Sequence, residues 1–309
     1  MAKISGRKRG RIASRLAAAA VTAALVGTGA SAFAADNPSA KPFKAPAAKP
    51  AKGALTGAQA SNPGDAPVYG LNAIDKAGDV YYYAPDGNGG LESRLKYDSG
   101  WSGIKWVGEV DHNADNLMDG VWEADYNGNL SYAAGDGSAP WKVGGGWNTY
   151  NTLLSPGNLG GAGAGDLLGR DGSGNLYLYL GYGDGKMTSR YLVGGGWGQY
   201  TALAGNGDLT GDGKADIVAR GGDGTLWLYK GTGNYKAPFE GRTKIGGGWN
   251  TYNTIFAAGD IDLDGKADLI GRDGSGALYL YKGTGNAAAP FAGRVQIGTS
   301  GWNTYRLFF

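Results

Sequence analysis

The feature that most constrains this chain is a Gly-Trp dipeptide that recurs about every 50 residues. Counted from one tryptophan to the next, the intervals are 46, 50, 52 and 53 residues. The tryptophans concerned are Trp101, Trp147, Trp197, Trp249 and Trp302. Self-similarity at a fixed period of this length indicates that one supersecondary unit is repeated along the chain.

A short run of aromatic and aliphatic residues lies midway through each repeat. The clearest examples are residues 176–179, 226–229 and 278–281, which alternate Leu with Tyr or Trp. Such runs are typical of β-strands, and the Asp-Gly and Gly-rich turns before them supply the positive φ that tight hairpins need. Several short strands within a period of this length predict the blades of a β-propeller.

The two ends of the array complete each other. The chain stops one strand into a sixth repeat, and the first repeat, which starts near Asp65, lacks that opening strand. We therefore expect an all-β fold, a five-bladed β-propeller over residues 65–309 closed by its C-terminal strand, because this pairing covers a sheet edge. The alternative is an open solenoid, which would need polar capping repeats, whereas residues 307–309 are apolar.

Composition excludes several classes of function. The 309-residue chain has no cysteine and one histidine, His112, which removes disulfide scaffolds, thiol nucleophiles and Cys-based zinc sites. We expect His112 to be a solvated turn residue, and we expect no enzyme, because nothing in the chain marks a nucleophile. Its 60 glycines approach a low-complexity composition, but 19 Tyr and 9 Trp favour a buried core.

Charge divides the chain into three parts. Residues 1–34 carry six basic and no acidic residues before an Ala-rich apolar run that ends in Ala32-Phe33-Ala34. This predicts a signal peptide cleaved after Ala34 and a secreted, extracellular protein; the alternative is a transmembrane anchor. Residues 35–64, rich in Pro, Ala and Lys, predict a linker. Residues 65–309 carry a net charge of −7, so we expect no nucleic-acid binding, no membrane span and a monomer.

Aspartates gather in a loop that several repeats share. Only four of the 27 acidic residues are Glu, and in these loops oxygen-bearing side chains occupy positions 1, 3, 5 and 9. Short carboxylates that converge in a tight turn suit Ca²⁺, with the backbone carbonyl at position 7 as a further ligand; the alternative is an ordinary polar turn. The predicted ligands are Asp260, Asp262, Asp264, Lys266 and Asp268 in repeat five, Asp208, Thr210, Asp212, Lys214 and Asp216 in repeat four, and Asp111, Asn113, Asp115, Leu117 and Asp119 in repeat two.

Repeat three departs from this pattern. It keeps only Asn158 and Asp166, with Gly160 and Ala162 at the middle positions. We expect it to have lost the ion, and this decay from repeat to repeat favours a structural rather than a catalytic cation.

Two resemblances follow from these motifs. The Asp-x-Asp-x-Asp-Gly-x-x-Asp loops resemble FG-GAP, or VCBS, repeats, the calcium-binding blades of integrin-type propellers, in three of the five repeats. Residues 66–309 are similar to the tachylectin-2 family of five-bladed lectins, most closely at residues 297–302 and 307–309. That resemblance implies the binding of N-acetylated amino sugars in pockets between neighbouring blades.

Two functions remain open. The first is lectin-like, multivalent binding of glycans or cell-wall sugars, in which several weak pockets on one ring gain avidity. Its predicted contacts are tryptophan-asparagine pairs, although a repeated tryptophan also suits the core between blades. The pairs are Trp147 with Asn148, Trp249 with Asn250, and Trp302 with Asn303. The second function is a calcium-dependent scaffold for protein-protein interaction or adhesion, without sugar binding.

Overall fold

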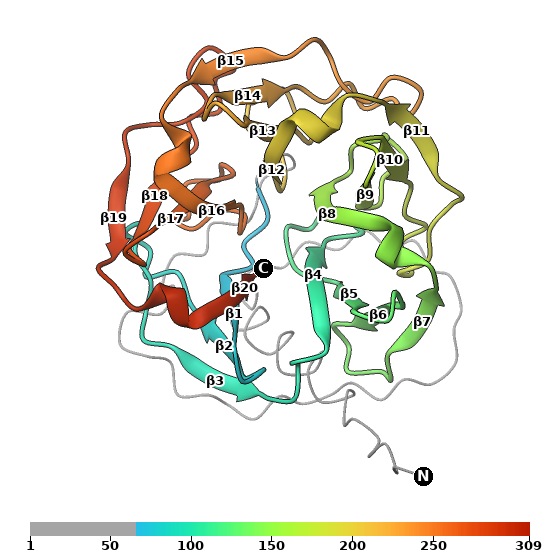
Figure 1. The fold of residues 1–309 in the computed structure, drawn as a ribbon, viewed down its shortest axis with the longest axis horizontal. Coiled ribbons are helices and arrows are strands. Elements are labelled where there is room, and N and C mark those ends of the chain that lie inside the picture. The colour runs from blue at the N-terminus through green and yellow to red at the C-terminus, as the bar shows by residue number, and fades with distance from the viewer. Residues whose placement is uncertain (1–65) are drawn as a thin grey trace, which may run out of the picture.

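The structure is a computed structural model that describes residues 66–309 as five four-stranded antiparallel sheets set around a central axis (Figure 1). The predicted signal peptide, 1–34, and linker, 35–64, lie outside the described residues. Within the described part there is no α-helix, and no helix has the length and apolarity that crossing a membrane requires. The all-β, five-bladed prediction is confirmed.

Each blade contains four strands, of which the first lies nearest the axis. Blade 1 consists of β20 (Tyr305–Phe308), β1 (Leu71–Asp75), β2 (Val80–Tyr83) and β3 (Leu95–Asp98); blade 2 of β4 (Ile104–Val110), β5 (Gly120–Asp125), β6 (Leu130–Ala134) and β7 (Trp141–Gly144); blade 3 of β8 (Tyr150–Gly157), β9 (Asp166–Asp171), β10 (Leu176–Tyr179) and β11 (Tyr191–Gly194); blade 4 of β12 (Tyr200–Ala204), β13 (Ile217–Gly221), β14 (Leu226–Tyr229) and β15 (Thr243–Gly246); and blade 5 of β16 (Tyr252–Phe256), β17 (Leu269–Asp273), β18 (Leu278–Tyr281) and β19 (Val295–Gly298).

The C-terminal strand closes the ring as predicted. β20 pairs antiparallel with β1, which places Phe308 opposite Ala73 and Leu307 opposite Ile74. The backbone N–H of Asn72 donates to the carbonyl of Phe309 at 2.8 Å, and the N–H of Phe309 donates back at 3.0 Å. The first and last segments of the propeller therefore share one sheet, and β20 covers the edge that β1 would otherwise leave open.

The recurring tryptophans pack between blades. Each of the last four begins a 3₁₀ turn, η2 (Trp147–Thr149), η3 (Trp197–Gln199), η4 (Trp249–Thr251) and η5 (Trp302–Thr304), just before an innermost strand. The glycine before each turn has a positive φ, 82° at Gly146, which a residue with a Cβ adopts only at a cost. Trp147 is 7% exposed and its ring lies 4.8 Å from that of Tyr179. These tryptophans form part of the hydrophobic clusters that join adjacent blades.

A cationic side chain also ties each blade to the next. Arg220 on β13, for example, donates to the carbonyl oxygens of Trp249 (3.2 Å) and Tyr252 (2.5 Å). The cations that make this contact around the ring are Arg170, Arg220, Arg272, Arg306 and Lys105. Because these carbonyls lie at blade boundaries, the cations supply donors that no sheet provides.

The chain enters the propeller across the Asp-rich loops. The N–H of Ala66 donates to the Gly265 carbonyl at 2.9 Å, and the N–H of Val68 donates to that of Asn116 at 3.1 Å. The carbonyl of Pro67 accepts from Asp260 at 2.8 Å. Residues 66–70 therefore connect the loop of repeat five with that of repeat two.

Candidate functional site

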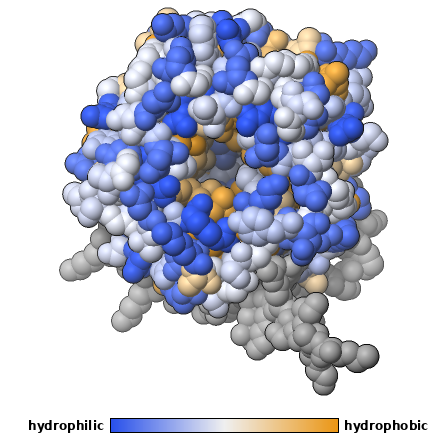
Figure 2. All heavy atoms as spheres, viewed as in Figure 1, coloured by the Kyte–Doolittle hydropathy of each residue, from blue (hydrophilic) through white to orange (hydrophobic). Residues whose placement is uncertain are grey.

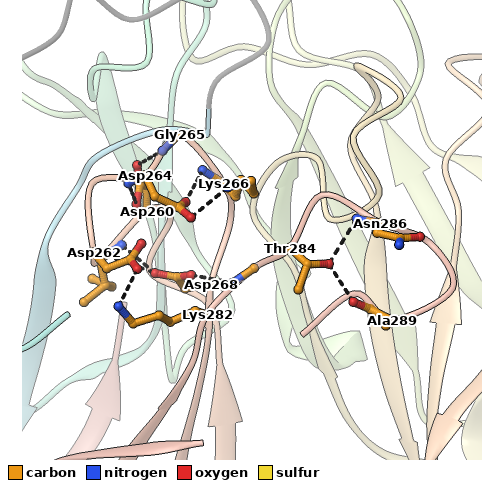
Figure 3. Close-up of polar contacts among 12 residues, drawn as sticks. Asp260, Asp262, Asp264, Gly265, Lys266, Asp268, Lys282, Thr284, Asn286 and Ala289 are labelled. Carbon is orange, nitrogen blue, oxygen red and sulfur yellow. Dashed lines mark hydrogen bonds and ion pairs between the residues drawn. The ribbon is translucent and has the colours of Figure 1, made fainter. Parts of the chain in front are cut away.

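The loop of repeat five joins β16 to β17 and brings three carboxylates together (Figure 3). Asp260, Asp262 and Asp268 each place one carboxylate oxygen within 4.8 Å of the others. Asp260 also fixes the turn, because its carboxylate accepts from the N–H groups of Asp264 (3.1 Å) and Gly265 (2.7 Å). Burial raises the pKa of Asp260 to about 6. Gathering such groups costs energy that a bound cation would offset.

Asp268 connects this loop to the end of the third strand of its blade. One carboxylate oxygen accepts from the N–H of Gly283 at 2.8 Å, and the other accepts from that of Ile261 at 2.8 Å. Burial raises its pKa to about 7, despite these hydrogen bonds. The position-9 aspartate is therefore a structural anchor as well as a predicted ligand.

Asp262 is the carboxylate of this cluster whose hydrogen bonding is incomplete. Its side chain is 6% exposed, and its Oδ1 is buried with no hydrogen-bond partner among the described residues. Its Oδ2 lies 2.8 Å from the ammonium of Lys282 (Figure 3). A buried carboxylate oxygen without a donor is costly, and together with Asp260 and Asp268 it forms a set of hard oxygen ligands that fits Ca²⁺.

Asp264 and Lys266, also predicted as ligands, form an ion pair at the loop surface. The Lys266 ammonium lies 2.8 Å from an oxygen of Asp264, and the Lys266 N–H donates to the other oxygen at 3.0 Å. Asp264 is not a member of the converging set. Its part in binding, and that of the Lys266 carbonyl, stay predictions.

Repeat four builds the same kind of cluster from Asp208, Asp212 and Asp216, again within 4.8 Å. The Thr210 hydroxyl donates to Asp208 at 3.3 Å, and the Lys214 N–H donates to Asp212 at 3.1 Å. Burial raises the pKa of Asp216 to about 6. Three carboxylates of the five predicted ligands thus converge in this loop.

The loop of repeat two is arranged differently. Its aspartates, Asp111, Asp115 and Asp119, do not form such a cluster among the residues that the structure describes. The side-chain oxygen of Asn113 accepts from the Asp115 N–H at 2.8 Å, and its amide lies 3.3 Å from Asp119. The N–H of Leu117 donates to Asp115 at 2.9 Å. The carboxylates of this loop accept hydrogen bonds from its own N–H groups, and its part in calcium binding stays a prediction.

Repeat three replaces the charged pair with an apolar contact. Asp166 keeps the anchoring role, accepting from the N–H groups of Leu159 (2.9 Å) and Gly181 (3.0 Å). At the place of Asp262 stands Gly160, and at the place of Lys282 stands Leu180; a Cβ on Gly160 would overlap the Leu180 side chain. The acid of position 3 and the lysine that faces it are thus both replaced here, and the loss of the ion stays a prediction.

His112 is buried, so its prediction as a solvated residue was wrong. It is 7% exposed and packs against Trp122 and Tyr132, with ring centroids 5.5 and 5.7 Å away. Burial lowers its pKa to about 4, which keeps the ring neutral at physiological pH. The loop sequence could not show this, because Trp122 and Tyr132 lie on β5 and β6 of the sheet beneath it.

A second candidate site is a pocket of about 350 Å³ between blades 2 and 3. One wall is the glycine corner after β7, and the other walls come from blade 3. The pocket is lined by Val143, Gly144, Gly145, Gly146, Trp147, Thr149, Tyr150, Tyr179, Met187, Thr188 and Arg190. Its only ionisable groups are two tyrosines and one arginine.

The polar wall of this pocket is a hydrogen-bonded chain. The hydroxyl groups of Tyr150 and Tyr179 lie 2.6 Å apart, and Arg190 Nη1 donates to Tyr150 at 3.2 Å. The Arg190 guanidinium also lies 4.4 Å from the ring centroid of Tyr177. Burial raises the pKa of Tyr179, so its hydroxyl stays protonated. The wall therefore offers fixed hydrogen-bond donors and acceptors beside the ring of Trp147.

The same four side chains recur in three other blades. A tryptophan, two hydroxyl-paired tyrosines and an arginine bonded to one of them form each set. The further sets are Trp197, Tyr200, Tyr229 and Arg242 in blade 4; Trp249, Tyr252, Tyr281 and Arg294 in blade 5; and Trp302, Tyr305, Tyr83 and Arg94 in blade 1. Blade 2 has lost the set, with Ile104, Ala133 and Pro140 at the matching positions.

The residues of the predicted tryptophan-asparagine pairs have different surroundings: one tryptophan lines the pocket, and the asparagines bond to, or lie beside, turns of the preceding blades. Trp147 lines the pocket, although most of its ring is buried. The amides of Asn250 and Asn303 donate to the carbonyls of Gly222 and Gly274, both at 3.0 Å, in turns of the preceding blades. Asn148 lies beside the matching turn of blade 2, and Trp249 and Trp302 are 7% and 8% exposed. Sugar contacts by these residues stay predictions.

The sequence interpretation missed the tyrosine pair and the arginine. The two tyrosines of a pair are 29 residues apart in blades 3, 4 and 5, so their contact depends on the fold. The arginine had a usable signal, since Arg94, Arg190 and Arg242 each lie seven residues before the next repeated tryptophan, and Arg294 lies eight before.

The face shown in Figures 1 and 2 is largely hydrophilic around a central hollow with hydrophobic side chains at its rim. Residues 208–271, which include the loops of repeats four and five, match the family model of an FG-GAP-like repeat. The chain is a five-bladed β-propeller of which residues 208–271 are similar to an FG-GAP-like repeat.

Comparison with known proteins adds fold likeness only. No curated protein sequence matches the chain. Among solved structures, an Agrocybe aegerita lectin with specific recognition of non-reducing terminal N-acetylglucosamine is 19% identical (TM-score 0.40; 75% of this chain and 56% of that one). AofleA from Arthrobotrys oligospora is 12% identical (TM-score 0.43; 78% and 76%), and Prp20p from Saccharomyces cerevisiae is 11% identical (TM-score 0.37; 76% and 64%). The chain thus spans less than two thirds of the first and the last of these.

Proposed function

We propose that this protein is a secreted, calcium-stabilised, multivalent carbohydrate-binding module without catalytic activity. The observation that carries the proposal is the repeated set of one tryptophan, two tyrosines and one arginine, which in blade 3 lines a pocket of about 350 Å³. That volume lies within the usual range of small-ligand sites and suits one sugar residue.

The chemistry of the pocket matches a pyranose. A sugar ring presents an apolar C–H face and several hydroxyl groups that both donate and accept hydrogen bonds. The edge of Trp147 and the side chain of Met187 offer apolar contact, while the Tyr150–Tyr179 pair and Arg190 offer polar partners. The glycine corner lacks side chains, so a ligand can approach the backbone closely.

Calcium enters the proposal as a structural ion. Asp260, Asp262 and Asp268 would hold one ion, and Asp208, Asp212 and Asp216 would hold another. Ca²⁺ in such a loop supplies charge compensation and holds the backbone in place. This role is consistent with the loss of the cluster from repeat three without loss of the blade.

Four copies of the set support multivalency. A single sugar residue in an open pocket binds weakly, but several pockets on one rigid ring act together on a surface that carries many copies of the sugar. We therefore expect millimolar affinity for a monosaccharide and much stronger retention on a dense glycan surface.

The test is retention on a glycan array and on immobilised N-acetylglucosamine, in calcium, for the wild type and for pocket-blocking variants. Gly145→Leu combined with Gly247→Leu places side chains at two glycine corners that have normal φ and open space, so folding should be unaffected. Gly172→Leu, in an equally open turn away from the pocket, is the matched control. We expect the double variant to lose retention and the control to keep it. Failure of the wild type to bind any glycan would remove the proposal.

A protein-binding scaffold is the second candidate function. The outermost strands expose large apolar side chains: Leu95 on β3 is 61% exposed, and Leu192 on β11 is 64% exposed. Each of these strands is the outer edge of its sheet, and an unpaired strand edge can be covered by another chain. Capture of a protein partner that Leu192→Ser abolishes, with no glycan retained, would favour this function.

A further inference from the structure

We infer that the pocket of blade 3 and the equivalent set of side chains in blade 5 bind a sugar residue that carries a carboxylate, and that Arg190 and Arg294 hold this acidic group. The inference rests on the proposed carbohydrate binding and names its ligand class. It follows from the charge of each pocket and from the hydrogen bonds that the arginines leave unused.

The four pocket arginines have no acidic partner. Among residues 66–309, none of Arg94, Arg190, Arg242 and Arg294 forms an ion pair with a carboxylate. Arg190 has five N–H donors, of which one is used, by Tyr150. All four arginines are exposed, so their unused N–H groups are accessible to an anionic ligand.

The guanidinium groups are held in place by aromatic rings. Arg190 lies 4.4 Å from the ring centroid of Tyr177, and Arg294 lies 4.6 Å from that of Tyr279. A planar guanidinium that is already oriented loses less entropy when it forms paired hydrogen bonds with a carboxylate. The arrangement therefore favours an acidic group over a neutral hydroxyl.

One neighbouring position divides the four sets into two classes. In blade 3 it is Thr188, which lines the pocket, and in blade 5 it is Ala292. In blade 4 the same position is Glu240, which lies 3.7 Å from Lys230, and in blade 1 it is Glu92. A carboxylate two residues from the arginine disfavours an acidic ligand, so we expect the sets of blades 3 and 5, where this residue is neutral, to bind it.

The test compares matched oligosaccharides that differ in one group. Glucuronate- and galacturonate-terminated chains are measured against their glucose and galactose counterparts by titration calorimetry and on an array, at low and high salt. A sialylated chain, whose carboxylate lies at the anomeric carbon, is a further arm that identifies the source of the acidic group. We expect about a tenfold preference for the acidic member of a pair, weaker at high salt.

The variants exploit the two classes of pocket. Arg190→Gln with Arg294→Gln should abolish the preference for the acidic member of each pair, whatever the loss in neutral-sugar binding, whereas Arg94→Gln with Arg242→Gln should leave the preference in place. Arg190→Lys with Arg294→Lys keeps the charge, so a reduced but remaining preference would exclude a folding defect. Equal binding of acidic and neutral sugars, or a preference that survives in the first pair of variants, overturns the inference alone. Absence of any sugar binding overturns the proposed function with it.

Discussion

Lys282 and a bound calcium ion would compete for the same carboxylate. The ammonium lies 2.8 Å from Asp262 Oδ2, while Oδ1 of the same group has no hydrogen-bond partner among the described residues. In repeat four the matching lysine, Lys230, lies 3.4 Å from Asp212, the aspartate at position 5 of that loop. Each cluster thus has a built-in cation that partly compensates its charge when calcium is absent.

Removal of this lysine should strengthen calcium binding. In Lys282→Met the incoming ion no longer displaces or repels an ammonium, and we expect the calcium affinity of repeat five to rise about tenfold, or about 1.4 kcal/mol. Titration calorimetry measures the change. Lys266→Met, which removes an equal charge from the loop itself but faces Asp264, is the control and should have a smaller effect. An equal rise in calcium affinity in both variants would show that the effect depends on net charge alone.

The position-9 aspartate should matter even where no ion binds. Asp166 accepts hydrogen bonds from backbone N–H groups through both carboxylate oxygens. In Asp166→Asn the side-chain NH2 group would face one of these N–H groups, so two donors would meet without an acceptor. We expect a loss of about 2 kcal/mol in the free energy of unfolding, by chemical denaturation, that calcium does not alter. An unchanged denaturation midpoint would contradict this anchoring role.

At the residue scale, the sequence was sufficient for the spacing of the carboxylates and insufficient for their partners. Asp260, Asp262 and Asp268 converge because a tight turn requires it. The bond from Asp268 to Gly283 and the contact of His112 with Trp122 join different strands, and such contacts depend on how the sheet is assembled.

At the scale of elements, the cationic side chain that bonds to backbone carbonyls of the next blade comes from either of two positions within a blade. In blades 3, 4 and 5 the arginine is on the second strand, as with Arg220. In blade 1 the cation is Arg306 on the innermost strand, and Ile74 stands where the other blades have arginine. The strands and turns could be predicted from local sequence patterns. This exchange could not, because the two positions lie on different strands, and only the fold shows that side chains at both reach the same carbonyl groups.

The arginine position of blade 1 can be introduced into blade 4. Arg220→Ile leaves the carbonyls of Trp249 and Tyr252 without their donor, and we expect a loss of about 2 to 3 kcal/mol in the free energy of unfolding. Adding Thr201→Arg, at the position of Arg306, should recover a measurable part of it. Thermal and chemical denaturation of the single and double variants give the comparison. A double variant no more stable than Arg220→Ile would show that the two positions are not equivalent.

At the scale of the whole molecule, ring closure was predictable because the two ends of the repeat array lack complementary parts. The path of residues 66–70 was not predictable. Its backbone bonds to Gly265 and Asp260 on one side and to Asn116 on the other, so it depends on the placement of loops from two blades. Order in the loop of repeat five is thereby linked to order where the chain enters the ring.

Removal of calcium should therefore destabilise both the loop of repeat five and residues 66–70. At a calcium concentration 100 times the dissociation constant, each occupied loop would stabilise the fold by about 2.7 kcal/mol, so excess chelator should lower the melting temperature. Asp262→Asn should lose part of this shift, and Asp262→Asn with Asp212→Asn should lose most of it. Hydrogen exchange should rise in chelator at residues 66–70 as well as 260–268, because Ala66 and Pro67 bond directly to that loop. The hairpin of β10 and β11, distant from both clusters, should keep its protection. A chelator that changes neither the melting temperature nor the exchange of residues 66–70 would show that these loops stabilise the ring without an ion.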